Sequence, residues 1–138
     1  NMFLHGMTQS GNPVGCATSS AAIDVYIKEK VAENAAKVGQ HVKQRFQKEF
    51  LPLPHIGDVG GLGLMLSLEI VADKATKARY GLGKMLEIRR RLLDKGIYAR
   101  VTSSIYGDRL HFGPPCIITQ AEADKAVDLI YSVLKDIK

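Results

Sequence analysis

Two closely spaced prolines limit what this chain can fold into. Neither Pro52 nor Pro54 can continue a helix, because proline lacks a backbone N–H and its ring clashes with the preceding turn. Before them, from Pro13 to about Phe50, apolar residues recur every three or four positions, as on one face of a helix. After them, short apolar runs alternate with glycines. We therefore expect a long helical stretch followed by a mixed α and β region.

The long helical stretch has a distinct start and two different halves. The Asn12 side chain can accept hydrogen bonds from the first free N–H groups, and Pro13 suits the first helical position. Residues 15–22 are nearly all small, so this half can lie close to another backbone and we expect it to be covered. Residues 35–50 are amphipathic. The stretch is too long for one ordinary helix, and we expect a break near Lys30 to Asn34.

An apolar run from about Leu64 to Val71 predicts a central strand that is covered on at least one face. The glycines at 60, 61 and 63 precede this run, and we interpret them as a tight bend. A dinucleotide-binding loop would need a third glycine at Leu66, and it would follow a strand and open a helix.

The remaining elements follow from periodicity and from helix caps. A helix is predicted from Lys84 to Lys95, ended by Gly96 in a left-handed conformation, with Met85, Ile88 and Leu92 on its apolar face. Short strands are predicted at 97–101 and 109–112, joined by a turn. Thr119 and Glu122 form a capping box before a last apolar stripe, which comprises Ala123, Val127, Ile130, Leu134 and Ile137. This order predicts an α+β fold of two layers, in which a short, mainly antiparallel sheet carries helices on one face.

Composition excludes several classes of protein. Hydrophobic residues make up 46% and charged residues 24%, which is typical of a globular domain. No apolar run approaches the roughly 20 residues that span a bilayer, so we expect no membrane segment. The two cysteines, Cys16 and Cys116, form no disulfide framework, which favours a reducing compartment, and we expect a cytoplasmic protein. The net charge of +5 is interpreted as a solubility feature.

Few residues suggest chemistry by themselves. The four histidines are scattered without metal-ligand spacing, so no metal site is expected. The run Arg89-Arg90-Arg91 is interpreted as a solvated helix face. Arg100, which we expect at the end of a strand before a turn, could clamp a carboxylate through two parallel hydrogen bonds or belong to a structural ion pair. These patterns alone define no complete active site.

Four motifs nevertheless resemble one enzyme family. Residues 5–17, HGMTQSGNPVGCA, are similar to the H-G-x-T-x-S-G-x-P-x-x-C/A-A signature of class-III (omega) aminotransferases. Residues 61–65, 69–77 and 112–119 read GLGLM, EIVADKATK and FGPPCIIT, and they resemble further stretches of that family in the same order. The resemblance covers essentially the whole chain.

The resemblance implies a part of a pyridoxal 5'-phosphate (PLP) enzyme of fold type I. Residues 1–50 would be the end of the large domain with its connecting helix, and residues 51–138 the small C-terminal domain. The complete enzyme would be a homodimer that moves an amino group from an amine or omega-amino acid to a keto acid such as pyruvate. No nucleic acid or membrane partner is implied.

The resemblance also implies roles for three residues. Thr8, with Met7 beside it, would bind the phosphate of the PLP in the partner subunit. Arg100 would be the mobile arginine that binds the substrate carboxylate. The family's Schiff-base lysine lies upstream of the first motif, so no catalytic residue is expected in this chain. We therefore expect the chain alone to bind no PLP and to be inactive. Gly60 stands where the family usually has arginine.

Two alternatives remain open at this point. The chain could be a stand-alone binding or regulatory module that reuses the small domain. Such a module would require a first helix whose surface can be exposed to solvent without a covering partner. It could also be a basic nucleic-acid-binding module. The second alternative lacks a stacking platform, because the sequence contains no Trp and its tyrosines are not interleaved with basic residues.

Overall fold

The computed structural model describes residues 6 and 8–137 of the chain. These residues form two compact units, one that ends at Ala32 and a second, Glu33–Lys138. No helix within the described residues is both long enough and apolar enough to cross a membrane.

The first unit contains one helix, α1 (Pro13–Lys28), which begins as predicted. The Asn12 side chain accepts hydrogen bonds from the N–H groups of Val14 and Gly15, at 3.0 and 3.1 Å. No residue of α1 is buried. The helix ends before Lys30, whose positive φ of 51° turns the chain. The predicted break is therefore confirmed, at the N-terminal edge of the expected range.

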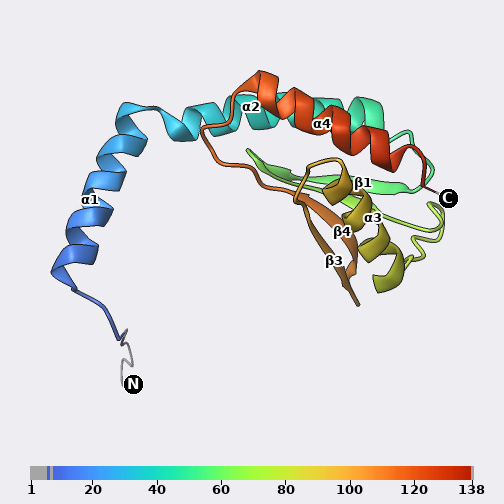
Figure 1. The fold of residues 1–138 in the computed structure, drawn as a ribbon, viewed down its shortest axis with the longest axis horizontal. Coiled ribbons are helices and arrows are strands. Elements are labelled where there is room, and N and C mark those ends of the chain that lie inside the picture. Colours follow the sequence, from blue (N-terminus) through green and yellow to red (C-terminus); the bar gives the residue numbers. More distant parts are fainter. Residues whose placement is uncertain (1–5, 7, 138) are drawn as a thin grey trace. The chain divides into compact units, whose positions relative to one another are not determined.

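The second unit is built around a four-stranded antiparallel sheet in the order β1-β2-β4-β3 (Figure 1). Its strands are β1 (Ile56–Leu62), β2 (Met65–Ile70), β3 (Arg100–Ser104) and β4 (Gly107–Phe112). Its helical elements are α2 (Val31–Arg45, whose first two residues lie in the first unit), the π-helix η1 (Phe46–Phe50), α3 (Leu82–Asp94) and α4 (Gln120–Leu134). The predicted α+β fold with a central β2 is confirmed.

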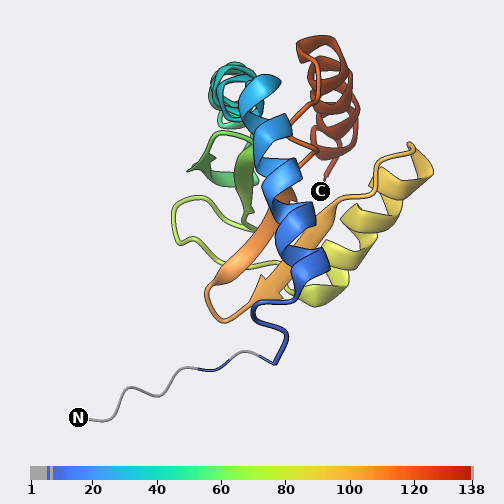
Figure 2. The same cartoon turned by 90° about the vertical axis from the view of Figure 1, so that its left-hand side faces the viewer.

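All the helices of this unit pack on one face of the sheet. Figure 2 looks almost along α2 and shows α2 and α4 side by side above the strands. The buried side chains of β2 and β4 that point to the helices are Leu66, Leu68, Ile70, Leu110 and Phe112. They meet the apolar stripes of the helices, and the predicted stripes of α3 and α4 are buried. The core therefore lies between the sheet and the helices, and it leaves the other face of the sheet uncovered within this unit.

The caps of α3 and α4 are those that the sequence predicts. Gly96 has a φ of 83°, and the Ile97 N–H donates to the Leu92 carbonyl at 2.9 Å, which is a Schellman cap. The Thr119 N–H donates to the Glu122 carboxylate at 2.9 Å, and the Thr119 hydroxyl accepts from the Glu122 N–H at 3.3 Å. Both helix ends are thus satisfied by local hydrogen bonds.

Two strand predictions were wrong. Residues 56–62 form β1 and not part of a bend, because the tight turn is confined to Gly63 and Leu64 and the preceding glycines pair with β2. The strand expected at 97–101 runs from Arg100 to Ser104 instead. Its hairpin closes through Ile105 and Tyr106 alone, so residues 102–104, which were expected in the turn, pair with β4. Arg100 consequently begins its strand and does not end it.

The backbone of α2 lies directly against the turn between β1 and β2. A Cβ atom placed on Gly39 would lie 2.1 Å from the carbonyl carbon and oxygen of Gly63. The Lys43 ammonium donates to the Gly61 carbonyl at 2.9 Å one helical turn further along. Only a glycine at position 39 allows this approach, because the opposing atoms belong to the backbone and cannot rotate away.

Replacing this glycine should destabilise the second unit. Alanine normally stabilises a helix relative to glycine, but in Gly39→Ala the clash should outweigh that gain and cost about 3 kcal/mol of unfolding free energy. Gly83→Ala in α3 is the matched control, because a Cβ there meets nothing within 4 Å. We expect this control to be neutral or to stabilise by up to about 1 kcal/mol. Urea denaturation followed by circular dichroism measures both, and equal stability of the two variants would contradict the close packing.

A buried histidine should make folding sensitive to acid. His55 is 3% exposed, and its Nε2 has no hydrogen-bond partner among the described residues. Burial lowers the pKa of His55 below its usual value of 6.5, and the positive charge of Lys74 lowers it further. A backbone hydrogen bond at Leu134 raises the pKa, but its effect is smaller than that of burial. The folded state therefore holds His55 neutral over a pH range where the unfolded chain takes up a proton.

The sign of this pH dependence follows from linkage. The stability due to neutral His55 is fully present above pH 6.5 and is lost as the pH falls towards the lowered pKa. The free energy of unfolding should fall with decreasing pH, with a slope of at most about 1.4 kcal/mol per pH unit for this one proton. His55→Leu should make that slope shallower. Denaturation curves at several pH values test this, and an unchanged slope in the variant would refute it.

Candidate functional site

The uncovered face of the sheet carries two parallel rows of polar side chains. Strand register places Ser67 opposite His111 and His111 opposite Arg100, which makes one row across β2, β4 and β3. The next row contains Glu69, Arg109 and Thr102. Side chains alternate between the faces of a strand, so both rows point away from the core.

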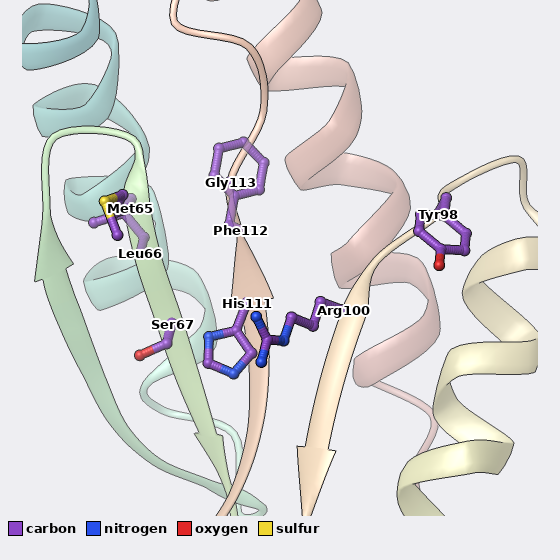
Figure 3. Close-up of a pocket in the computed structure, with 8 residues that line it drawn as sticks. All are labelled: Met65, Leu66, Ser67, Tyr98, Arg100, His111, Phe112 and Gly113. Atoms are coloured by element: carbon purple, nitrogen blue, oxygen red, sulfur yellow. The ribbon is translucent and has the colours of Figure 1, made fainter. Parts of the chain in front are cut away.

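A cavity of about 440 Å³ lies over the first row. Figure 3 shows the imidazole of His111 between the hydroxyl of Ser67 and the guanidinium of Arg100. The cavity has a polar part, formed by this row, and an apolar part. Its lining residues are Met65, Leu66, Ser67, Tyr98, Arg100, His111, Phe112 and Gly113. The site could therefore hold a ligand that combines an anionic group with an apolar one.

Arg100 is exposed and is free to bind an anion. Within the described residues no carboxylate lies at ion-pair distance from its guanidinium. The structural ion pair considered from the sequence is therefore absent from this part of the chain. An unpaired guanidinium beside a cavity has the donor geometry that carboxylates prefer.

The other arginine on this face is already engaged. Glu69 accepts from the Lys77 ammonium at 3.4 Å, and its other oxygen lies 3.9 Å from the Arg109 guanidinium. Arg109 also donates to the Ser67 hydroxyl at 3.4 Å. Glu69 therefore partly neutralises the positive charge of its own row, whereas the row of Arg100 contains no acidic side chain.

His111 lies in the middle of this positive surface. Its Nε2 is 3.0 Å from the Thr102 hydroxyl, and the two share a hydrogen bond. Burial lowers the pKa of His111, and the positive charges of Arg100 and Arg109 lower it further. The imidazole is therefore neutral at neutral pH. The sequence analysis missed His111, Ser67 and Thr102, although the alternation of polar and apolar residues in each strand places all three on one face.

The other two predicted site residues are Thr8 and Met7, which precede α1 in the sequence. Thr8 stands in an exposed turn before α1, and Met7 lies outside the described residues. A shallow hollow at the start of α1 involves Asn12, Gly15 and Cys16 among others. The Asn12 side chain already accepts from two amide donors of that helix end, and the Asn12 N–H donates to the Gln9 carbonyl at 3.4 Å. Within the described residues, the Thr8 hydroxyl and the N–H groups of residues 9–11 make no hydrogen bond and could serve as donors.

The described residues provide no metal site. No group of three or more His, Cys, Asp or Glu side chains in residues 6 and 8–137 is arranged to hold a metal ion. Cys16 and Cys116 are free and exposed. The polar chemistry of the described part of the chain therefore centres on the Arg100 row and on the turn at Thr8.

Comparisons with known proteins agree on one family. The family model "Aminotransferase class-III" matches residues 1–134. The uncharacterized aminotransferase y4uB of Sinorhizobium fredii is 34% identical over 139 residues, which cover 98% of this chain and 29% of that protein.

Solved structures are similar over the same length. A thermostable (S)-enantioselective omega-transaminase from Thermomicrobium roseum has a TM-score of 0.84 and 32% identity, covering 99% of this chain and 30% of its own. A PMP-bound aminotransferase from Vibrio fluvialis has a TM-score of 0.82 and 34% identity, covering 96% of this chain and 29% of its own. The chain thus spans less than a third of the length of each of these three proteins.

The arrangement of charges predicts how His111 titrates. Arg100→Gln removes one of the two positive charges that lower its pKa, so the pKa of His111 should rise, although burial still keeps it below the usual value. Histidine Cε1–H resonances followed by NMR against pH measure this directly. His55 is the internal control, since its pKa should stay unchanged. An unchanged pKa for His111 would mean that Arg100 does not act on it.

Proposed function

This chain belongs to the class-III aminotransferase family, and we propose that it is the C-terminal part of a longer PLP-dependent enzyme. The proposal is supported by the match over nearly the whole chain to less than a third of the relatives' length. The complete enzyme would transfer an amino group from an amine or omega-amino acid to a keto acid such as pyruvate. The names of the similar omega-transaminases support this reaction class.

The observation that carries the proposal is the unpaired Arg100 beside a cavity on the uncovered sheet face. Its guanidinium would bind the substrate carboxylate through two parallel hydrogen bonds. The apolar side chain of Met65, which is 84% exposed on the same face, lines the same cavity and would accept the apolar part of an amine. One cavity could then receive both substrates in turn.

The turn at Thr8 suits one part of a cofactor site. A hydroxyl and backbone N–H groups in a turn are the donors that phosphate oxygens accept from. In the proposed homodimer, Thr8 and Met7 would hold the phosphate of the PLP bound in the other subunit. When bound, PLP would carry the amino group between the two substrates. PMP, the amine form of this cofactor, is present in the Vibrio fluvialis structure.

The exposed α1 supports an assembly with the rest of the enzyme. None of its residues is buried, although it carries Val14, Ile23 and Ile27, which are 76%, 56% and 71% exposed. We propose that the remainder of the chain and a second subunit cover this helix. A stand-alone module is less well supported, because the surface of α1 would then have to be exposed to solvent without apolar side chains that need a covering partner.

We propose that the chain by itself is inactive and holds no PLP. Transamination needs a lysine that anchors the cofactor and moves a proton, and the resemblance places that lysine upstream of residue 5. A cytoplasmic location stays a prediction from the cysteine content.

Cofactor titration tests this proposal. The purified chain and a longer protein that contains it would be mixed with PLP, reduced with borohydride, and analysed by mass spectrometry. We expect a stoichiometric lysine adduct and amino transfer to pyruvate in the longer protein, and neither in the 138-residue chain. A stoichiometric adduct on one lysine of this chain would refute its inactivity. A longer protein without amino transfer would refute the function.

A further inference from the structure

The Arg100 row contains a titratable side chain to which the proposed function gives no role. We infer that His111 is a specificity-determining residue of the carboxylate site: when protonated, it adds a second positive charge beside Arg100 and strengthens the binding of substrates that carry a carboxylate. This inference rests on the proposed function, and it adds that the preference for such substrates changes with pH.

His111 and Arg100 are neighbours on the uncovered face of the sheet. His111 pairs directly with Arg100 across β4 and β3, and both side chains line the same cavity. Figure 3 shows the imidazole and the guanidinium side by side on the uncovered face. A carboxylate held by Arg100 in this cavity would therefore lie within reach of the imidazole. The row is also open at its other end, because a Cβ atom placed on Gly60 would meet only the Ser67 hydroxyl within 4 Å, at 3.8 Å.

The two ring nitrogens of His111 have different surroundings. Thr102 engages the Nε2 atom of His111 at 3.0 Å. Among the described residues, Nδ1 makes no hydrogen bond, so this atom is free for a ligand. A protonated imidazole donates from both ring nitrogens, and it could then keep the Thr102 contact while donating to a carboxylate.

The charges around His111 would couple its protonation to the binding of an anion. The charged groups that face His111 are Arg100 from β3 and Arg109 from its own strand, while Glu69 of β2 is engaged with Arg109 and Lys77. The two arginines disfavour a third positive charge, which keeps the imidazole neutral. A carboxylate on Arg100 would offset this repulsion. Carboxylate binding and protonation of His111 would then favour each other, since such linkage is reciprocal.

Pyruvate titrations of the purified chain test the inference. Pyruvate keeps its carboxylate ionised at about pH 5 and at about pH 8, and acetone serves as the matched ligand without a carboxylate. Binding would be followed by NMR at constant ionic strength, with chloride replacing pyruvate in the reference. We expect pyruvate to bind about fivefold more tightly at the lower pH, the upper range for an exposed ion pair. The pKa of His111 should rise when pyruvate is bound.

Three variants separate the possible outcomes. His111→Gln keeps a polar side chain without a titratable charge, so pyruvate binding should become independent of pH. His41→Gln is the control histidine, which pairs with Asp124 at 2.7 Å between α2 and α4, and it should keep the wild-type pH dependence. Arg100→Gln should weaken binding at both pH values. Thermal unfolding and the amide spectrum would verify that each variant is folded.

The variants separate a failure of the proposed role of His111 from a failure of the proposed carboxylate site at Arg100. If Arg100→Gln abolishes binding while His111→Gln keeps the pH dependence, the role of His111 is refuted and the role of Arg100 stands. If neither substitution changes binding, or if the wild-type chain shows no saturable response to pyruvate, the carboxylate site itself is refuted. A response to acetone equal to that of pyruvate would likewise show that the carboxylate is not recognised.

Discussion

The contact between α2 and the β1–β2 turn determines how the second unit is built. Because Gly39 has no side chain, the helix backbone can touch the backbone of Gly63. This contact places the following turns of α2 and η1 over the sheet, where Phe46 packs edge to face on Phe112 with ring centroids 5.7 Å apart. Phe50 in turn meets Tyr131 of α4, at 5.2 Å between ring centroids. The absence of a side chain at Gly39 thus permits the close approach of α2 that accompanies these two aromatic contacts.

The site is a consequence of the same one-sided packing. All helices of the second unit take one face of the sheet, so the alternate residues of β2, β4 and β3 are left without a covering layer. Those residues are polar, and register lines them up in rows. The acidic Glu69 partly neutralises one row, whereas the guanidinium of Arg100 has no ion-pair partner within the described residues. This difference in charge between two adjacent rows is the feature on which the proposed carboxylate site rests.

Helices and caps could be predicted from the sequence, because their signals are local. Asn12 with Pro13, Gly96, and Thr119 with Glu122 each act within a few residues, and all three are confirmed. β1 could not be predicted, because glycines weaken the strand signal and its pairing with β2 only emerges in the fold. The neighbours of Arg100 were missed for a similar reason. Ser67 and His111 are 44 positions apart in the sequence and adjacent only through strand register.

The helix α1 also bears on the order in which such a chain becomes structured. A helix of 16 residues gains little from its own hydrogen bonds, and most helical stability in proteins comes from packing an apolar face. Since α1 buries nothing, its main local support is the Asn12 cap. The second unit, by contrast, has a hydrophobic core of its own. Since the sheet unit has a core and α1 has none, we expect the sheet unit to form without α1, and α1 to gain its full stability only if another surface covers it.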